Sequence, residues 1–173
     1  MVLSRENLMQ RLDELGIRSV TRDHAPLFTV EDSKSLRGEI PGTHSKNLFL
    51  KDKKGALFLV VAEEDAVINM KRFHQTIGSA RLSFGKPDLL LEVLGTTPGS
   101  VSPFTLINDT NNRVNVILDA KLMEREIVNF HPLTNEATTS LSPQDLLTFI
   151  ASCGHEPQIV QVASEETSGD VGE

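Results

Sequence analysis

The stretch GTHSKNLFLKDKKGALFLVVA, residues 42–62, decides the fold class. Its two apolar runs, residues 48–50 and 56–62, are separated by the polar segment KDKKG, which ends in a glycine. Two such runs joined by a short glycine-containing loop predict a β-hairpin. Lys46 stands at the head of the first strand, which makes it a candidate for a fixed functional cation. The alternative is a surface lysine that snorkels beside the hairpin.

Helical and strand patterns alternate outward from this hairpin, without an internal repeat. Helices are predicted over residues 5–15, 29–38, 63–77, 86–94 and 143–153, and strands over 17–24, 46–52, 56–62, 80–84, 105–109, 114–119, 126–130, 136–141 and 158–163. Ser4 and Ser142 are the predicted N-caps of the first and last helices, and Gly16 and Gly154 follow their ends. We therefore predict a mixed α/β (α+β) single domain with one curved, barrel-like mixed sheet and surrounding helices.

Length and composition set the outer bounds. The 173 residues are 39% hydrophobic, which suits one domain with a sizeable core, here expected over residues 1–163. Apolar runs are too short for a membrane span and the N-terminus lacks a signal-peptide pattern, so we expect a cytoplasmic protein without membrane contact. The single cysteine, Cys153, excludes an internal disulfide and is expected to be a small core residue near a helix end.

Charge is unevenly distributed along the chain. The net charge is −7, yet the stretch from Lys46 to Lys86 holds eight basic and four acidic residues, a balance of +4. The rest holds nine basic and twenty acidic residues, and residues 164–173 form an acidic tail that is expected to be disordered. The basic stretch is either an ordinary solvated surface or a patch that meets phosphate groups.

Three places carry polar residues that a core does not explain. The first is Lys46 with Asn47 and His44. The second is the loop GTTPGSVSP, residues 95–103, whose glycines let backbone N–H groups approach a ligand. The third is His131 in NFHPLTN, held by the following proline. Each of the three places also has a structural interpretation without function, as a surface residue or as an ordinary connection between elements.

Familiar catalytic motifs do not match. The chain has no Gly-x-x-x-x-Gly-Lys phosphate loop, no Gly-x-Ser-x-Gly elbow and no paired His or Cys spacing for zinc. The sequence therefore argues against nucleotide hydrolysis and zinc chemistry, and we predict no metal or cofactor.

The combined pattern resembles the YbaK/ProX family of aminoacyl-tRNA deacylases, the editing domains of the prolyl-tRNA system. The resemblance covers about residues 5–163 and rests on SKNLFLKD, LGTTPGSVSPF, VNVILDAKL and VNFHPLTNEATTSLSPQDLLTFI, in that order. The histidine-bearing NFHPLTNEATT, with no synthetase body attached, looks most like the free-standing editor that removes alanine from proline tRNA. The resemblance also implies the editing-domain fold.

The resemblance implies roles for particular residues. Lys46 would lie beside the terminal adenosine and the aminoacyl ester, and the backbone of Gly95, Gly99 and Ser100 would meet the ester carbonyl. His131 would help frame the amino-acid pocket. The set expected to bind substrate is His131, Asn47, His44 and Pro103, and the set expected to bind tRNA is Lys51, Lys53, Lys54, Lys71 and Arg72.

The implied reaction is hydrolysis of the alanyl ester by a positioned water, assisted by a ribose hydroxyl of the substrate. The implied partner is the acceptor end of tRNA(Pro) carrying alanine, and whether a prolyl-tRNA synthetase also takes part stays open. Two alternatives remain. One is a cysteinyl-tRNA(Pro) deacylase of the same family, and the other is a non-catalytic nucleic-acid-binding protein, against which the absence of Trp and Tyr counts.

Overall fold

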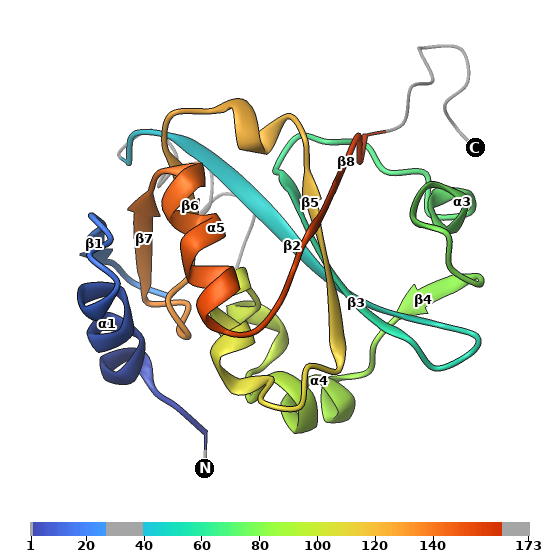
Figure 1. The fold of residues 1–173 in the computed structure, drawn as a ribbon, viewed down its shortest axis with the longest axis horizontal. Coiled ribbons are helices and arrows are strands. Elements are labelled where there is room, and N and C mark those ends of the chain that lie inside the picture. The colour runs from blue at the N-terminus through green and yellow to red at the C-terminus, as the bar shows by residue number, and fades with distance from the viewer. Residues whose placement is uncertain (1, 27–39, 164–173) are drawn as a thin grey trace.

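The predicted hairpin is the centre of the fold. In the computed structural model, which describes residues 2–26 and 40–163, β2 (Thr43–Asp52) pairs antiparallel with β3 (Leu57–Glu63), and Gly55 between them has a φ of 92°. That left-handed conformation suits the glycine of the tight connection. β2 runs diagonally across the molecule and carries partners at both of its ends (Figure 1).

Eight strands form one mixed sheet around β2 and β3 in the described residues. The other strands are β1 (Val20–Asp23), β4 (Leu82–Phe84), β5 (Val114–Asp119), β6 (Val128–Phe130), β7 (Ala137–Leu141) and β8 (Gln158–Val160). Their order is β1-β7-β6-β2-β3-β5-β8, with β4 on the far end of β2. The β2–β6, β3–β5 and β5–β8 pairs are parallel, and the others are antiparallel.

Side chains on opposite faces of the hairpin enter two separate apolar clusters. On β3, Leu57, Leu59 and Val61 join the larger cluster, while Phe58, Val60 and Ala62 join the smaller one. Because alternate residues of a strand point to opposite faces, the continuous apolar run is that of a strand buried on both sides. β3 is accordingly buried over nearly its whole length.

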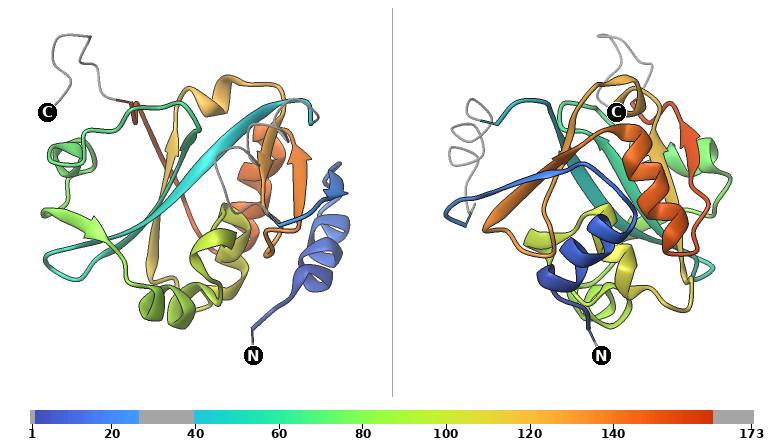
Figure 2. Two further views of the ribbon diagram at one scale, coloured as in Figure 1. Left: turned by 180° about the vertical axis from the view of Figure 1, so that it is seen from behind. Right: turned by 60° about the vertical axis from the view of Figure 1, so that its left-hand side comes forward.

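Helices cover the two clusters from different sides. The α-helices are α1 (Arg5–Glu14), α3 (Phe73–Ile77), α4 (Pro87–Leu94) and α5 (Pro143–Ser152), and the 3-10 helices are η1 (Pro98–Ser100), η2 (Pro103–Asn108) and η3 (Leu122–Glu124). Both the front and back views show α1, α4 and α5 gathered toward one end of the molecule and α3 with β4 toward the other (Figures 1 and 2).

Several predicted boundaries are confirmed by backbone geometry. Ser142 Oγ accepts a hydrogen bond from Asp145 N at 3.0 Å and so caps α5. Gly16, Gly95 and Gly154 follow the ends of α1, α4 and α5 in left-handed conformations. These signals are local, which is why they could be located in the sequence.

Two predicted elements are wrong. The helix expected over residues 63–77 is confined to α3, because Ala66, Ile68 and Met70 pack on the smaller cluster with the two-residue period of extended chain. Asn69 Oδ1 accepts from Lys71 N at 3.1 Å, an Asx-type turn that delays the helix start.

The strand expected over residues 105–109 is instead part of η2. Ser102 Oγ accepts from Phe104 N at 3.1 Å, and the following proline opens the helical turn. The helix expected over 29–38 and the tail over 164–173 lie outside the described residues.

Cys153 is a partly buried residue at the C-cap of α5, as expected. Burial raises the pKa of its thiol above the usual range. Over residues 2–26 and 40–163, no helix combines the length and apolar character that crossing a membrane requires.

Candidate functional site

A polar face covers one side of the β1-β7-β6-β2 part of the sheet. The register pairs Arg22 with Thr138, Ser140 with Asn129, and Asn129 with His44. Paired residues share a face, and so do residues two apart on one strand. The resulting set, here called the polar sheet face, is Arg22, His24, His44, Lys46, Asn129, His131, Thr138 and Ser140.

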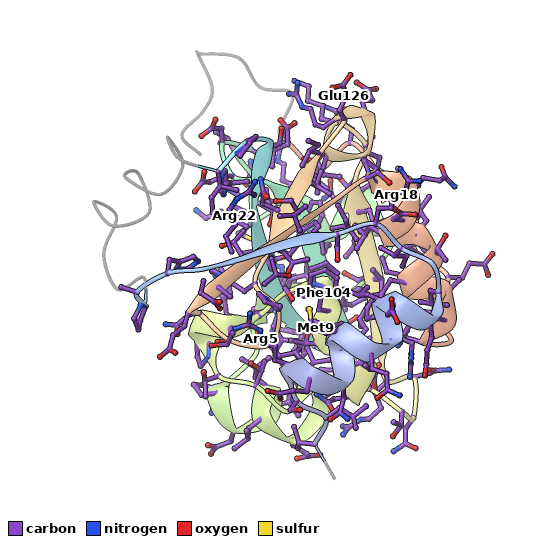
Figure 3. All side chains as sticks on the ribbon, turned by 90° about the vertical axis from the view of Figure 1, so that its left-hand side faces the viewer. Arg5, Met9, Arg18, Arg22, Phe104 and Glu126 are labelled. Carbon is purple, nitrogen blue, oxygen red and sulfur yellow. The ribbon has the colours of Figure 1, made fainter. Side chains whose placement is uncertain are left out.

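The opposite face of the same strands is apolar. Val128, Phe130 and Leu141 enter the larger cluster there, and Phe104 of η2 packs edge-on against Phe130 with the ring centroids 5.9 Å apart. Figure 3 shows Arg22 and Phe104 on opposite sides of the β1 ribbon. One face therefore holds the strands in place, and the other presents the polar groups.

Asn129 and Thr138 are the most buried members of the polar sheet face, each with 2% exposure, and Asn129 makes several hydrogen bonds. Its Nδ2 donates to the Pro41 carbonyl at 3.0 Å and more weakly to the Thr43 carbonyl at 3.4 Å, and its Oδ1 accepts from the Ser140 hydroxyl. The two carbonyls flank the turn that leads into β2. Asn129 thus fixes the main chain at the start of β2, just before His44 and Lys46.

His131 is held as a neutral imidazole with a defined tautomer. Burial lowers its pKa below the usual range; the hydrogen bond to the Ala137 carbonyl opposes this shift, and the nearby rings of His24 and His44 add to it. Nδ1 lies 3.1 Å from the Ala137 oxygen, so it is the nitrogen that carries the proton. Nε2 then presents a lone pair and can accept a hydrogen bond.

His24 supports the same corner of the face. Its ring lies 6.4 Å from that of His131, and its Nε2 is 2.9 Å from Thr138 Oγ1. Since Nδ1 of His24 faces the Ala25 carbonyl at 2.8 Å, the Thr138 hydroxyl donates to Nε2. His24 was not among the site residues predicted from the sequence.

The glycine and proline loop, residues 95–103, is attached to His131. Ser102 Oγ donates to the His131 carbonyl at 2.7 Å, and a Cβ at Gly99 would lie 3.7 Å from Asn135 Nδ2. Pro103 is buried at the start of η2. The hydrogen bonds of the described residues thus join the loop to the segment around His131 and not to Lys46.

Within this loop, the three residues expected to meet the ester carbonyl differ in setting. Gly95 ends α4 with a φ of 65°, and a Cβ there would come within 2.9 Å of Val2 Cγ1. The Ser100 N–H already donates to the Thr97 carbonyl at 2.9 Å. Gly95 and Ser100 therefore have evident structural roles, whereas Gly99 is exposed.

Lys46 and Asn47 point to opposite sides of β2. Lys46 Nζ donates to the Ala66 carbonyl, which holds the ammonium against residues 64–72. Lys46 and His131 each follow the parallel His44–Asn129 pair by two residues; Lys46 lies on β2, and His131 directly follows the end of β6. Asn47 donates to Ser45 Oγ at 3.2 Å and has a buried Oδ1 without a hydrogen-bond partner among the described residues.

The basic residues expected to bind tRNA are exposed and surround β4. Lys51 and Lys53 line a cavity of about 570 Å³ with Lys86 and the exposed Phe84, and Lys54 lies in the β2–β3 turn. Lys71 lines a second cavity, and Arg72 precedes α3. No group of three His, Cys, Asp or Glu among the described residues is placed to hold a metal ion.

Several members of the polar sheet face were missed because their partners lie far away in sequence. The available signal was a spacing of two residues along three predicted strands. Arg22 and His24 show it, as do Thr138 and Ser140, and so do Asn129 and His131, the residue directly after its predicted strand. Sequence alone does not say which strands pair, so it could not bring these residues onto one face.

Comparison with known proteins supports the resemblance. The family model described as "Aminoacyl-tRNA editing domain" matches residues 24–149. The chain is 36% identical over 160 residues to the prolyl-tRNA editing protein ProX of Acetoanaerobium sticklandii, covering 92% of this chain and 98% of that protein. It is 40% identical over 161 residues to prolyl-tRNA synthetase associated domain-containing protein 1 of Bos taurus, covering 90% and 94%.

A solved structure shares the fold. The crystal structure of a candidate trans-editing enzyme for prolyl tRNA synthetase superimposes with a TM-score of 0.67 at 20% identity, over 92% of this chain and 98% of that one. The matched residues include β2, β6 and β7 of the polar sheet face and begin at His24, directly after β1. The chain therefore belongs to the aminoacyl-tRNA editing domain family, as a YbaK/ProX-type deacylase of the prolyl-tRNA editing kind.

Proposed function

We propose that this protein hydrolyses the ester between alanine and the 3′ end of mischarged tRNA(Pro). The observation that carries the proposal is the parallel pairing of His44 with Asn129, from which Lys46 on β2 and His131 after β6 each follow by two residues. The relatives named as prolyl-tRNA editing and prolyl-tRNA synthetase associated proteins support the choice of tRNA. The histidine-bearing NFHPLTN segment supports alanine as the amino acid.

Lys46 supplies a positioned charge in this proposal. Its ammonium donates to the Ala66 carbonyl, and an ammonium retains further N–H donors for an ester or phosphate oxygen. A fixed cation beside the reacting ester stabilises the negative charge that develops on the carbonyl oxygen. The Gly99 peptide of the loop is the second donor that we assign to this oxygen.

His131 serves the amino-acid end. A neutral imidazole with a free lone pair on Nε2 can accept a hydrogen bond from the α-ammonium group of the substrate, whereas an imidazolium would repel it. The Ser102 hydroxyl holds the main-chain carbonyl of His131 and the Ala137 carbonyl holds its ring, so the residue also limits the volume available to the amino acid. We assign His131 to binding and size selection, and activation of the water to a ribose hydroxyl of the substrate.

The test is ester loss from tRNA(Pro) charged with alanine, cysteine, serine or proline, with and without prolyl-tRNA synthetase. We expect alanyl-tRNA(Pro) to be hydrolysed fastest and the bulkier prolyl ester to survive. Some hydrolysis of the seryl ester is also expected, because small differences in side-chain size give only about 1–3 kcal/mol of discrimination between substrates. Preferred hydrolysis of the cysteinyl ester would contradict the choice of alanine. If none of the four esters is hydrolysed, the proposed activity is contradicted.

Lys46→Ala provides the residue-level test. We expect deacylation to be lost while the circular dichroism spectrum stays that of the wild type, since the charge and not the fold is removed. Lys121→Gln is the matched control because Lys121 is an exposed lysine at the start of η3. Normal turnover by Lys46→Ala would overturn the role given to this residue.

A further inference from the structure

Asp119 is a buried carboxylate that the site described above does not use. It is the last residue of β5, its exposed fraction is 1%, and among the described residues it forms no ion pair with a lysine, arginine or histidine. Removing a charged group from water costs free energy that hydrogen bonds to the charge must offset. The hydrogen bonds of Asp119 therefore indicate what this residue holds in place.

Both carboxylate oxygens of Asp119 accept hydrogen bonds from main-chain N–H groups. Oδ2 accepts from Glu63 N and Oδ1 accepts from Lys121 N, each at 3.1 Å. β3 and β5 run side by side (Figures 1 and 2), and their parallel register ends at the Val61–Leu118 pair. Beyond that pair, the Asp119 side chain supplies the acceptor for the last residue of β3. Because hydrogen bonds to a carboxylate are stronger than those between neutral groups, Asp119 fixes the chain where it leaves β3.

A tight turn follows β3 directly and ends at the hydrogen-bond partner of Lys46. Ala66 N donates to the Glu63 carbonyl at 3.0 Å, which closes the turn. The Ala66 carbonyl in its place accepts a hydrogen bond from Lys46 Nζ. These residues are called the 63–66 turn below. A continuous path of hydrogen bonds therefore leads from Asp119 through the 63–66 turn to the ammonium group of Lys46.

Two further contacts hold the 63–66 turn. Arg125 Nε donates to the Glu63 carboxylate, and the Glu63 side chain is only 14% exposed. Glu64 N donates to the His44 carbonyl of β2 at 3.0 Å. Arg125 is the C-cap of η3 and Lys121 is its N-cap, so the segment around η3 is bonded at one end to Asp119 and at the other to the turn itself. The turn is thus fixed from β2, β5 and η3.

A fixed partner matters for Lys46 because a lysine side chain is flexible. The ammonium group lies at the end of four methylene groups, so the position of the Ala66 carbonyl largely decides where the charge lies. A displacement of that carbonyl would move or release the ammonium. Small misplacements of a group that stabilises the transition state are costly in rate.

We infer that Asp119, with Arg125 as a second anchor, is a positioning residue for Lys46. It acts without touching the substrate, by holding the 63–66 turn so that the Ala66 carbonyl places the ammonium beside the reacting ester. The effect on the rate rests on the proposed function. The placement of Lys46 is a property of this chain alone, and it can be measured without substrate.

Asp119→Asn tests the inference with little change in shape. The amide is neutral and has one oxygen, so at least one of the bonded N–H groups loses its acceptor. On alanyl-tRNA(Pro) we expect kcat to fall about tenfold with little change in KM, because stabilisation of the transition state is lost while substrate binding is kept.

Asp109→Asn is the matched control. Asp109 is also buried, and its carboxylate accepts from Arg113 N and Val114 N, each at 2.9 Å. Its contacts with these residues and with His155 lie away from the path that leads to Lys46. The control therefore removes a buried carboxylate from main-chain N–H groups elsewhere in the fold, and kcat should stay at the wild-type value.

Chemical labelling of Lys46 gives a readout that a merely structural role would not change. Brief treatment with N-hydroxysuccinimide acetate acetylates accessible amines, and mass spectrometry compares Lys46 with the exposed Lys86 in the same sample. The half-buried Lys46 amine is shielded while it is bound to the Ala66 carbonyl. We expect Lys46 to be acetylated severalfold faster in Asp119→Asn and at the wild-type rate in Asp109→Asn.

Two results would overturn the inference while the deacylase proposal stands. One is a folded Asp119→Asn variant with the wild-type kcat, whatever its labelling. The other is a fall in kcat with Lys46 labelled at the wild-type rate, or an equal fall in Asp109→Asn, since Asp119 would then support only the fold. Circular dichroism and thermal unfolding report whether each variant is folded.

The remaining outcomes are also decisive. Should Asp119→Asn fail to fold, Arg125→Gln takes its place, because the Arg125 side chain is half exposed and its loss leaves the apolar clusters intact. Wild-type labelling of Lys46 in Arg125→Gln would then overturn the inference, and faster labelling would support it. If wild-type protein does not hydrolyse alanyl-tRNA(Pro), the proposed function fails, while the labelling still decides whether Asp119 holds Lys46 in place.

Discussion

Replacing Asn129 by alanine tests whether this residue positions the start of β2. The asparagine side chain bonds to two carbonyls at 3.0 and 3.4 Å and to the Ser140 hydroxyl, all from a site that is 2% exposed. A net contribution of about 1 kcal/mol per hydrogen bond, plus the cost of buried groups left unpaired, gives a loss of about 2–4 kcal/mol in the free energy of unfolding. Urea unfolding measures this loss directly.

Activity should fall further than stability alone explains. The bonded carbonyls belong to Pro41 and Thr43, directly before His44 and Lys46 on β2. We therefore expect kcat/KM on alanyl-tRNA(Pro) to drop at least tenfold at temperatures where Asn129→Ala is fully folded, since small misplacements of a positioned group are costly.

Two variants bracket this effect. Ser140→Ala removes the partner of Asn129 Oδ1 and a long contact from Arg22 Nη1 at 3.5 Å, and it should cost about 1 kcal/mol with little loss of activity. Gly42→Ala disturbs the same turn from the other side, because Gly42 has a φ of 104° and a Cβ there would come within 2.6 Å of Ile127 Cγ2 and 2.9 Å of Asn129 Nδ2. If Asn129→Ala is no less stable and no less active than Ser140→Ala, the positioning role is refuted.

Four further predictions concern the site and the surface. Charge reversal at Lys51, Lys53 and Lys54 should weaken tRNA binding and flatten its salt dependence, and an unchanged slope would place the tRNA elsewhere. Because its lowered pKa keeps His131 neutral, deacylation should stay level from about pH 7 to 8.5 and decline only under more acidic conditions, where the ring gains a proton and the folded state also loses stability. His131→Ala should slow alanyl ester hydrolysis while bulkier esters gain relative to it; a uniform loss of about 100-fold with a flattened pH profile would instead indicate a general base. Burial raises the thiol pKa of Cys153, so iodoacetamide should label the folded protein far more slowly than the urea-unfolded chain at about pH 7.5, which mass spectrometry can follow.

Signals that act within a few residues were readable from the sequence. The hairpin of β2 and β3, the caps of α1 and α5, and the glycines after α1, α4 and α5 all depend on short-range conformational preferences. Lys46 and His131 were found because they interrupt such patterns or belong to a recognisable family segment.

Long-range pairing decided the rest. Residues 64–72 have a helix-compatible composition, yet they form two turns joined by residues 66–69, which have no regular structure. Ala66, Ile68 and Met70 pack there on the smaller cluster. The charged stretch from Lys46 to Lys86 predicted a basic surface, but only the folding of β4 against β2 divided it into two cavities.

The amino-acid sequence by itself determined the mixed α/β class, the central hairpin and the family, and it singled out Lys46 and His131 as candidate site residues. Tertiary structure alone placed Arg22, His24, Asn129, Thr138 and Ser140 beside them, and gave His131 its neutral tautomer. The physical reason is that a strand's two faces follow from its own residues, whereas its neighbours follow from the free energy of the whole sheet and its two apolar clusters.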